Sequence, residues 1–282
     1  MTDLADRRWR LVVDEARDGA TQMALEEVAA RTALAEDLRT VRVYSWEPST
    51  LSLGYRQEAD TVDWEYCERE GIDVTRRQTG GGGIYHDRYA DISYTIVAPA
   101  DEVPGDLMEC YALFCEPILE AFERLGVDAD FAANAQAAIY EPSCYLRDIH
   151  PAHDVVAPAS ADGDPEPKKI SGNAQYRQRD VVIQHGSLSY DLEPERHVGV
   201  FDADLKPETF IDRVTSIREQ AGVGRGEAVS TIGGALGDWC EADEDTWREG
   251  ELEAAADLAA TKYGSDDWIH DRDVREQEQS RP

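Results

Sequence analysis

Hydrophobic positions along the chain alternate with polar ones or recur at helical spacing, and together the two patterns predict a mixture of strands and helices. Apolar residues recur at roughly helical spacing over residues 21–32, where we expect a helix. A short helix is expected over residues 62–70, and Gly71 is a normal residue to end it. The segments with the character of strands are residues 9–13, 41–46, 51–53, 72–76 and 92–97.

The most regular helical pattern covers residues 106–125, which we expect to form a long helix. Pro117 in its interior removes one backbone hydrogen bond and is expected to kink the helix. Gly126 is expected to end it. The apolar residues that share one stripe are Leu107, Tyr111, Phe114, Ile118, Phe122 and Leu125.

The second half of the chain predicts a β-hairpin and a return to helix. Residues 170–176 and 181–190 have the pattern of two strands joined by a turn at residues 178–180. Residues 144–149 predict another strand, and residues 243–264 predict helix.

A Pro-rich, acidic segment interrupts this half. Residues 157–167 (APASADGDPEP) have no hydrophobic periodicity and are expected to form a solvated loop. The chain has no internal repeat and no clear boundary, so we expect one mixed α/β domain over residues 1–282. Its core should cover about residues 20–232, with a helical segment at 233–282 and no large accessory domain.

The charge of the chain is strongly unbalanced. Its 59 acidic and 28 basic residues give a formal net charge of −31, and only four of the basic residues are Lys. Such self-repulsion destabilises a compact state in ordinary salt, whereas molar salt shortens the Debye length to about 3 Å. The surface therefore resembles that of cytoplasmic proteins from extreme halophiles, and it excludes a nucleic-acid binder because no basic stripe exists.

The five Cys and six His residues give no sign of a disulfide framework or a metal cluster. No C-x-x-C pair is present, and the first ten residues have no apolar segment typical of an export signal. No run approaches 18 apolar residues, so a membrane span is not expected. We therefore expect a cytoplasmic protein with reduced thiols.

The strongest local signal is the glycine-rich segment at residues 76–87, RRQTGGGGIYHD. Four glycines after a strand let the backbone approach a ligand closely and point N–H groups at an anion. The preceding Arg76 and Arg77 can bind phosphate or carboxylate in a bidentate manner. The segment is neither a P-loop nor a dinucleotide fingerprint. Four glycines alone are more often a flexible turn.

A second signal is the pair Lys168 and Lys169, which opens the segment KKISGNAQ and precedes QHGS at residues 184–187. A solvated pair at the end of a loop is the ordinary interpretation of two Lys residues. In a chain that nearly always uses Arg, however, half of all Lys residues lie here. A compact ammonium can contact an acyl phosphate in a way that a planar guanidinium cannot, which suggests a chemical role.

Together the two motifs resemble those of the lipoate–protein ligase and octanoyl/lipoyl transferase superfamily. The pattern R-R-x-[ST]-G-G-G, a hydrophobic pair and His-Asp is followed in order by K-[IV]-x-G-x-A-Q and Q-H-G-S. The similarity extends over nearly the whole chain. The further segments that carry it are residues 22–27, 48–57 and 262–268.

This resemblance implies an α/β fold like that of class II aminoacyl-tRNA synthetases and biotin/lipoate ligases, a mixed sheet with flanking helices. It implies a lipoate–protein ligase that activates lipoate with ATP and Mg²⁺ to lipoyl-AMP. The lipoyl group would then pass to a lysine of a carrier domain, on a 2-oxoacid dehydrogenase acyltransferase subunit or the glycine cleavage H protein. The first step depends mainly on positioning and electrostatics.

The motifs also imply roles for individual residues. Lys169 would be the catalytic residue, bridging the lipoyl carboxyl group and the adenylate phosphate, and Lys168 ranks second. Arg77 would hold the nucleotide phosphate. Asp91 is the nearest equivalent of an acidic family position and would reach the phosphate through Mg²⁺. The expected nucleotide-lining residues are Gly82, Gly83, Ile84 and Tyr85, and those expected at the lipoate are Lys169, Gly81 and His185. A satisfied core histidine is an equal alternative for His185.

The octanoyltransferases of the same superfamily are the main alternative. They place a nucleophilic Cys four residues before a Pro-Ser pair, which is present here as Pro142-Ser143. At that position this chain has Ala138, which cannot form a thioester. Cys144 lies six residues later in a predicted strand, where a small buried hydrophobic residue is the better interpretation. We therefore expect an ATP-dependent ligase, with ATP-independent transfer between carrier proteins as the alternative.

Two further possibilities concern partners. A scaffold that binds a carrier domain without chemistry would be expected to lose the motif residues, and Arg77, the glycines and Lys169 are all present. Bacterial ligases of the family have a C-terminal accessory domain, and some archaeal relatives use a separate protein. Little chain follows the matched core here. The expected partners are thus a lipoyl-acceptor carrier protein and a separate small accessory subunit, with neither nucleic acid nor membrane.

Overall fold

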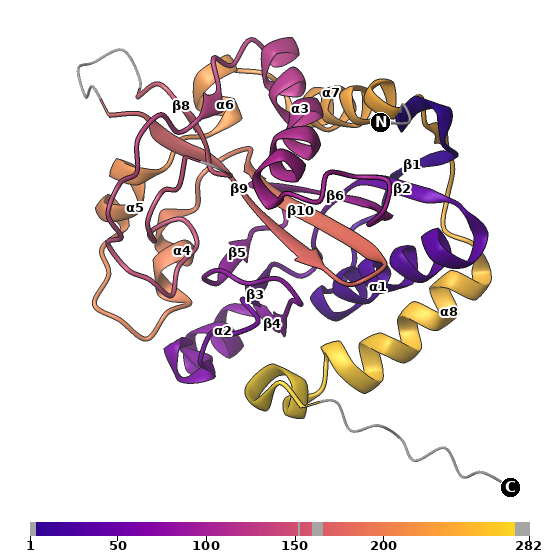
Figure 1. The fold of residues 1–282 in the computed structure, drawn as a ribbon. Helices are drawn as coiled ribbons and strands as arrows, with labels where there is room; N and C mark the ends of the chain where they lie inside the picture. Colours follow the sequence, from indigo (N-terminus) through magenta and orange to yellow (C-terminus); the bar gives the residue numbers. More distant parts are fainter. Residues whose placement is uncertain (1–3, 152, 160–165, 274–282) are drawn as a thin grey trace, which may run out of the picture.

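The computed structural model describes residues 4–151, 153–159 and 166–273, which form a large mixed sheet with helices on both faces (Figure 1). The strands of this sheet are β1 (Trp9–Val13), β2 (Arg39–Tyr44), β6 (Asp91–Pro99), β7 (Asp130–Phe131), β8 (Val155–Ala157), β9 (Lys168–Arg177), β10 (Val181–Ser189) and β11 (Asp243–Glu244). Their order is β11-β1-β2-β6-β10-β9-β8-β7. β1 pairs in parallel with β2 and β11, and the other neighbours are antiparallel.

A second sheet of three strands carries the glycine-rich segment. It consists of β3 (Thr50–Leu53) between β4 (Asp73–Arg76) and β5 (Ile84–His86), with α2 (Trp64–Glu70) leading into β4. Arg76 holds this sheet to the C-terminal part of the chain. Its Nε donates to the carbonyl oxygen of Ile269 at 2.8 Å, and Nη1 donates to that of Gly54 at 2.8 Å. Arg76 is therefore a structural residue of the small sheet.

Helices cover both faces of the large sheet because successive strand residues point to opposite sides. Leu11 belongs to the core under α3 (Leu107–Leu125) and α7 (Arg225–Cys240), whereas its neighbour Val12 belongs to the core under α1 (Gly19–Glu36) and α8 (Glu249–Leu258). The shorter helices are α4 (Pro194–Gly199), α5 (Pro207–Arg213) and α6 (Ile217–Ala221). Among the described residues, no helix is long and apolar enough to cross a bilayer.

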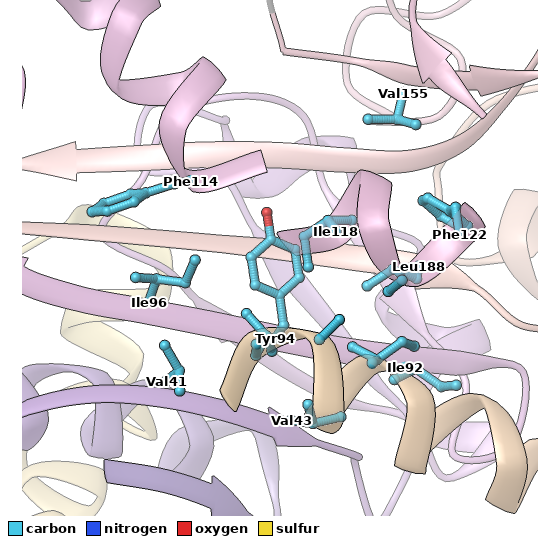
Figure 2. Close-up of a cluster of buried hydrophobic side chains, with 14 of the residues drawn as sticks. Val41, Val43, Ile92, Tyr94, Ile96, Phe114, Ile118, Phe122, Val155 and Leu188 are labelled. Atoms are coloured by element: carbon cyan, nitrogen blue, oxygen red, sulfur yellow. The ribbon is translucent and has the colours of Figure 1, made fainter. Parts of the chain in front are cut away.

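The larger core lies between α3 and strands β2, β6 and β10 (Figure 2). Figure 2 shows Phe114 and Ile118 of α3 over Ile96 and Tyr94 of β6. Phe114 and Ile118 have no exposed surface. Asp106 caps α3 by accepting hydrogen bonds from the backbone N–H groups of residues 108 and 109, and Gly126 ends it in the left-handed region.

Most of the strand and helix predictions are confirmed, and the errors lie where local pattern gave no clear signal. The hairpin of β9 and β10 is present, and α3 runs through Pro117 as one element. The strand predicted at residues 144–149 is wrong, because this segment is a succession of turns. The helix predicted from residue 243 begins instead at Glu249, since Asp243–Glu244 pairs with β1. Of the loop predicted at 157–167, residues 160–165 lie outside the described residues.

Truncation of Phe114 should be strongly destabilising because the cavity it leaves lies between α3 and the sheet. Phe114→Ala is expected to lower the free energy of unfolding by about 3–5 kcal/mol, measured by denaturant titration in molar salt. Leu34→Ala on α1 is the control, because Leu34 is 51% exposed and such surface changes stay within about 0.5 kcal/mol. Similar unfolding midpoints for the two variants would contradict this placement of the core.

Candidate active site

A cavity of about 310 Å³ lies where the two sheets meet. Strands β6, β9 and β10 form one side, and the glycine-rich segment and residues 144–150, 153 and 154 form the other. The side chains that line it include three basic ones, Arg77, Arg147 and Lys169, and two acidic ones, Asp148 and Asp154. The Cys144 thiol and the imidazoles of His86, His150, His153 and His185 line it as well. The cavity thus gathers cations, two carboxylates and a thiol in a chain of net charge −31.

Lys169 is the most fully enclosed charge of the cavity. It lies at the start of β9, and its side chain is 2% exposed. Its Nζ contacts a carboxylate oxygen of Asp154 at 2.7 Å and donates to the carbonyl oxygen of Cys144 at 3.0 Å. Burial by itself favours the neutral amine, but Cys144 and Asp154 outweigh it and raise the pKa of Lys169 above its usual value. Lys169 is therefore an ammonium.

Lys168 is separated from its neighbour by the alternation of the strand. Its Nζ donates to the carbonyl oxygen of Ile211 at 2.8 Å, and Lys168 does not line the cavity. Lys168 and Lys169 are adjacent in the sequence, but as successive residues of β9 they point to opposite faces of the sheet.

Cys144 lies beside Lys169, although no motif in the sequence favours it. Its Sγ is 3.8 Å from the Nζ of Lys169. It packs with Ile84 and Val214 in a small hydrophobic cluster, and it also lines the cavity. The interpretation as a buried small residue was therefore incomplete. All five cysteines are described, and Cys144 is the one that lines the cavity.

The glycine-rich segment positions Cys144 by direct backbone contact. Gly83 donates from its N–H to the carbonyl oxygen of Pro142 at 2.6 Å, and the N–H of Cys144 donates to the carbonyl oxygen of Gly83 at 2.9 Å. A Cβ atom on Gly82 would lie 2.7 Å from the carbonyl oxygen of Pro142 and 2.8 Å from the nitrogen of Cys144. A Cβ on Gly172 would lie 3.1 Å from the Cys144 sulfur. Glycine is needed here for close approach.

Arg77, expected at a nucleotide phosphate, is engaged by the protein in this structure. Nε donates to the hydroxyl oxygen of Thr79 at 2.9 Å, and Nη1 donates to the carbonyl oxygen of Ser52 at 2.7 Å. Nη2 donates to the carbonyl oxygens of Gly80 and Gly82 at 2.9 and 2.7 Å. Burial lowers the pKa of Arg77 to about 10. The guanidinium thus holds the glycine turn together, and its role toward a phosphate stays a prediction.

The other residues predicted to line a ligand divide into two groups. Gly81, in the left-handed region with φ 94°, and Ile84 line the cavity. Gly82 and Gly83 lie behind them, in contact with residues 142–144. Tyr85 points away, and its hydroxyl donates to Asp87 at 2.9 Å. The nucleotide role assigned to these residues also stays a prediction.

His185 belongs to a buried polar chain that supports the glycine turn. Its Nδ1 is 2.9 Å from a carboxylate oxygen of Glu26, and its Nε2 is 2.7 Å from the hydroxyl oxygen of Thr79. Burial raises the pKa of Glu26, but His185 and Arg42 outweigh this and lower it overall. Both ring nitrogens of His185 therefore have protein partners, as expected for a satisfied core histidine, even though the ring lines the cavity.

Asp91 is surrounded by protein donors rather than facing the cavity. Its Oδ2 accepts hydrogen bonds from Ser93 at 2.6 Å and from Trp46 at 3.2 Å, and it lies 3.2 Å from the Nδ1 of His86. Its Oδ1 accepts a hydrogen bond from Ser187. Among the described residues, no group of three or more His, Cys, Asp or Glu side chains could hold a metal ion. Asp91 as arranged here does not fit a Mg²⁺ ligand, and we derive no step through that ion.

Comparison with known proteins shows which family the chain belongs to. The family model for the lipoyl protein ligase A/B catalytic domain matches residues 18–231. The chain belongs to the lipoyl protein ligase A/B family. It is 34% identical to an octanoyltransferase LipM of Kyrpidia tusciae over 280 residues, which cover 92% of this chain and 97% of that protein. It is 30% identical to octanoyltransferase LipM of Bacillus subtilis, over 94% of this chain and 98% of that protein.

Solved structures of the family have the same fold. The bipartite lipoate protein ligase of Thermoplasma acidophilum superposes with a TM-score of 0.78 at 22% identity, covering 96% of this chain and 99% of that one. A lipoate–protein ligase A bound with ATP superposes with a TM-score of 0.75 at 24% identity, covering 93% and 98%. The family and the mixed sheet with flanking helices expected from the sequence are therefore confirmed. The chain is an enzyme of the lipoate ligase/transferase family.

The resemblance implies a nucleophilic thiol in the transferases, so the position of a Cys relative to the cavity matters. Ala138, which stands where the transferases were expected to have their nucleophile, is partly exposed and does not line the cavity. The cavity's thiol comes from Cys144. Arg213 of α5 helps to hold the intervening segment, since it donates to the carbonyl oxygens of Ala137 at 3.0 Å and Arg147 at 3.2 Å.

A methyl group on Gly82 should move Cys144 away from Lys169. Gly82→Ala places its Cβ within 3 Å of three backbone atoms of residues 141, 142 and 144, so the turn must shift. The alkylation rate of Cys144 and any acyl transfer should change by about 10–100-fold, read by mass spectrometry of the folded protein. Gly80→Ala is the matched control, because nothing lies within 4 Å of its Cβ. Equal behaviour of the two variants would contradict the positioning role.

Proposed function

We propose that this enzyme is an acyltransferase that moves an octanoyl or lipoyl group from a donor protein to a lysine of a carrier protein, with Cys144 as the intermediate acyl acceptor. The observation that carries the proposal is the Cys144 thiol, 3.8 Å from the Lys169 ammonium in the cavity. The full-length similarity to octanoyltransferases supports it. The sequence alone had favoured a ligase because of Ala138.

The chemistry requires no nucleotide when the donor is a thioester. Cys144 gives up its thiol proton as its sulfur attacks the donor's carbonyl carbon. The bond from that carbon to the donor's sulfur breaks, and the released thiolate takes up a proton, which balances the one that Cys144 lost. In the second step the acceptor lysine amine attacks the Cys144 thioester, an amide forms, and the Cys144 thiol is regenerated. Covalent catalysis of this kind divides one difficult transfer into two easier ones.

Lys169 supports both steps through its charge. An ammonium close to the sulfur stabilises negative charge there, and in a buried site such an interaction is stronger than in water. It can also stabilise the oxyanion of each tetrahedral intermediate. Asp91 and Arg77 are occupied by protein partners, so the arrangement of the cavity favours this route over one that uses Mg²⁺ and ATP.

The partners follow from the reaction. The acceptor is a carrier domain that presents a lysine, and the donor is an octanoylated protein. A separate accessory subunit belongs to the proposal only in the ligase alternative, where the structurally similar Thermoplasma acidophilum protein is described as bipartite. That alternative, activation of lipoate by ATP, is favoured by one observation, the absence of a Cys at position 138.

Loss of the Cys144 thiol should abolish transfer. Wild-type protein incubated in molar salt with an octanoylated donor, without ATP, should form an adduct on Cys144 and then modify the apo-carrier. Cys144→Ala should form no adduct and transfer at least about 1,000-fold more slowly. Cys67→Ala is the control, since Cys67 is another buried thiol, outside the cavity. Carrier modification by Cys144→Ala from free lipoate and ATP, with none from the donor, would favour the ligase and refute the proposal.

Lys169 should not be replaceable by arginine. Lys169→Arg keeps the positive charge, but the longer planar group cannot occupy the enclosed site between Asp154 and Cys144 without moving one of them. We expect at least about a 100-fold loss of acyl transfer, roughly the cost of misplacing a reacting group by 1 Å. Lys168→Arg should have little effect because Lys168 does not line the cavity. Retained activity in Lys169→Arg would remove Lys169 from the site.

A further inference from the structure

Asp154 is the carboxylate that most directly neutralises the Lys169 ammonium, and no sequence motif drew attention to it. Its side chain is 4% exposed, and its Oδ1 lies 2.7 Å from the Nζ of Lys169. Its Oδ2 accepts a hydrogen bond from the backbone N–H of His150 at 2.8 Å. The Nδ1 of His153 lies 3.7 Å from the same Oδ1. Oδ1 therefore faces the ammonium and an imidazole, and Oδ2 is held by the backbone.

The backbone fixes the relative position of the two charges. Asp154 immediately precedes β8, and β8 pairs with β9, with Val156 opposite Lys169. The carbonyl oxygen of Asp154 also accepts from the N–H of Ala132 at 3.0 Å. Because Asp154 adjoins β8 and Lys169 lies in β9, the pairing of the two strands fixes the relative position of the two backbones.

An ammonium buried this deeply requires a counter-charge. Desolvation penalises the charged form of a buried lysine, and a close carboxylate is the usual compensation. Asp154 is the carboxylate in contact with the Nζ of Lys169, and the Cys144 sulfur at 3.8 Å adds to the counter-charge when it is a thiolate. The Nζ of Lys169 also contacts the carbonyl oxygen of Cys144 and lies 5.5 Å from the centre of the Tyr145 ring. Arg147, also close, is itself a cation and opposes the charge on Lys169.

We propose that Asp154 is a positioning residue of the transfer site, which holds the Lys169 side chain protonated and beside the Cys144 thiol. The proposal rests on the acyl-transfer function proposed above. Asp154 does not touch the reacting atoms. It acts through Lys169, by fixing where the ammonium lies and by keeping it charged at the pH of the reaction.

The sign of the pH effect follows from the groups that face Lys169. Asp154 and Cys144 raise the pKa of Lys169, whereas burial and Arg147 lower it. If the carboxylate of Asp154 is removed, the pKa of Lys169 must fall. Activity that depends on the ammonium is present below that pKa and lost as the pH rises through it. The loss at alkaline pH should therefore begin at a lower pH in Asp154→Asn than in the wild type.

The test measures formation of the octanoyl adduct on Cys144 in single-turnover reactions over a range of pH, by mass spectrometry of the intact protein. Asp154→Asn should lower the rate at neutral pH about 10-fold and move the alkaline loss of activity down by at least about one pH unit. Asp191→Asn is the matched control, because Asp191 pairs with Arg218 at 2.6 Å but does not line this cavity.

The possible outcomes separate the two proposals. A wild type that forms no Cys144 adduct refutes the acyl-transfer function and this inference with it. In a second outcome, the wild type forms the adduct and Asp154→Asn is slower at every pH, but both lose activity at the same alkaline pH. Asp154 is then merely structural, and the inference alone fails. Asp154→Glu covers the case in which the Asn variant does not fold. It keeps the charge, so adduct formation should be lost at the same alkaline pH as in the wild type. Loss at a lower pH would overturn the inference.

Discussion

The close backbone contact between the glycine turn and residues 142–144 is the constraint on which the cavity depends. Gly83 donates a hydrogen bond to Pro142 and accepts one from Cys144 across this contact, and Gly82 leaves no room for a side chain. The turns at 144–149 have no strand to order them, so this contact takes the place of a sheet ladder. It gives the glycine run a structural purpose that differs from binding an anion. The run brings a thiol from an irregular segment to the end of a regular strand.

A network of buried charged and polar side chains supports this backbone contact. Arg42, Glu26, His185, Thr79 and Arg77 form a continuous polar chain, from the large sheet and α1 to the carbonyl oxygens of the glycine turn. Each of these side chains contacts the next one in the chain, and a buried polar network stabilises a structure to the extent that its groups are paired. The Nε of Arg42 is the atom of this polar chain that has no hydrogen-bond partner. The chain couples the large sheet to the small one, so both walls of the cavity are fixed by the same network.

The buried arginines and Lys169 have different roles in this protein. Arg10, Arg39, Arg76 and Arg77 are almost fully buried and bind carboxylates or backbone carbonyl oxygens with several donors each, which a planar guanidinium does well. Lys169 instead presents a compact charge to one carboxylate and one thiol. Of the four lysines, Lys169 is the one that lines the cavity, where it supplies a point charge on a flexible stem.

The sequence by itself determined most of the helices and strands and the family, and it singled out Lys169 and the glycine run as candidate site residues. Hydrophobic periodicity and motif order are local properties, so they identified α3, the β9–β10 hairpin and the two motifs without knowledge of the fold. Only the tertiary structure decided that Cys144 and Asp154 join Lys169, that Lys168 does not, and that Arg77 and Asp91 are engaged within the protein. Residues 144 and 154 precede Lys169 by 25 and 15 positions, in segments without periodicity. Their approach depends on the pairing of β8 with β9 and on the glycine contact, and both are long-range interactions that no local pattern encodes.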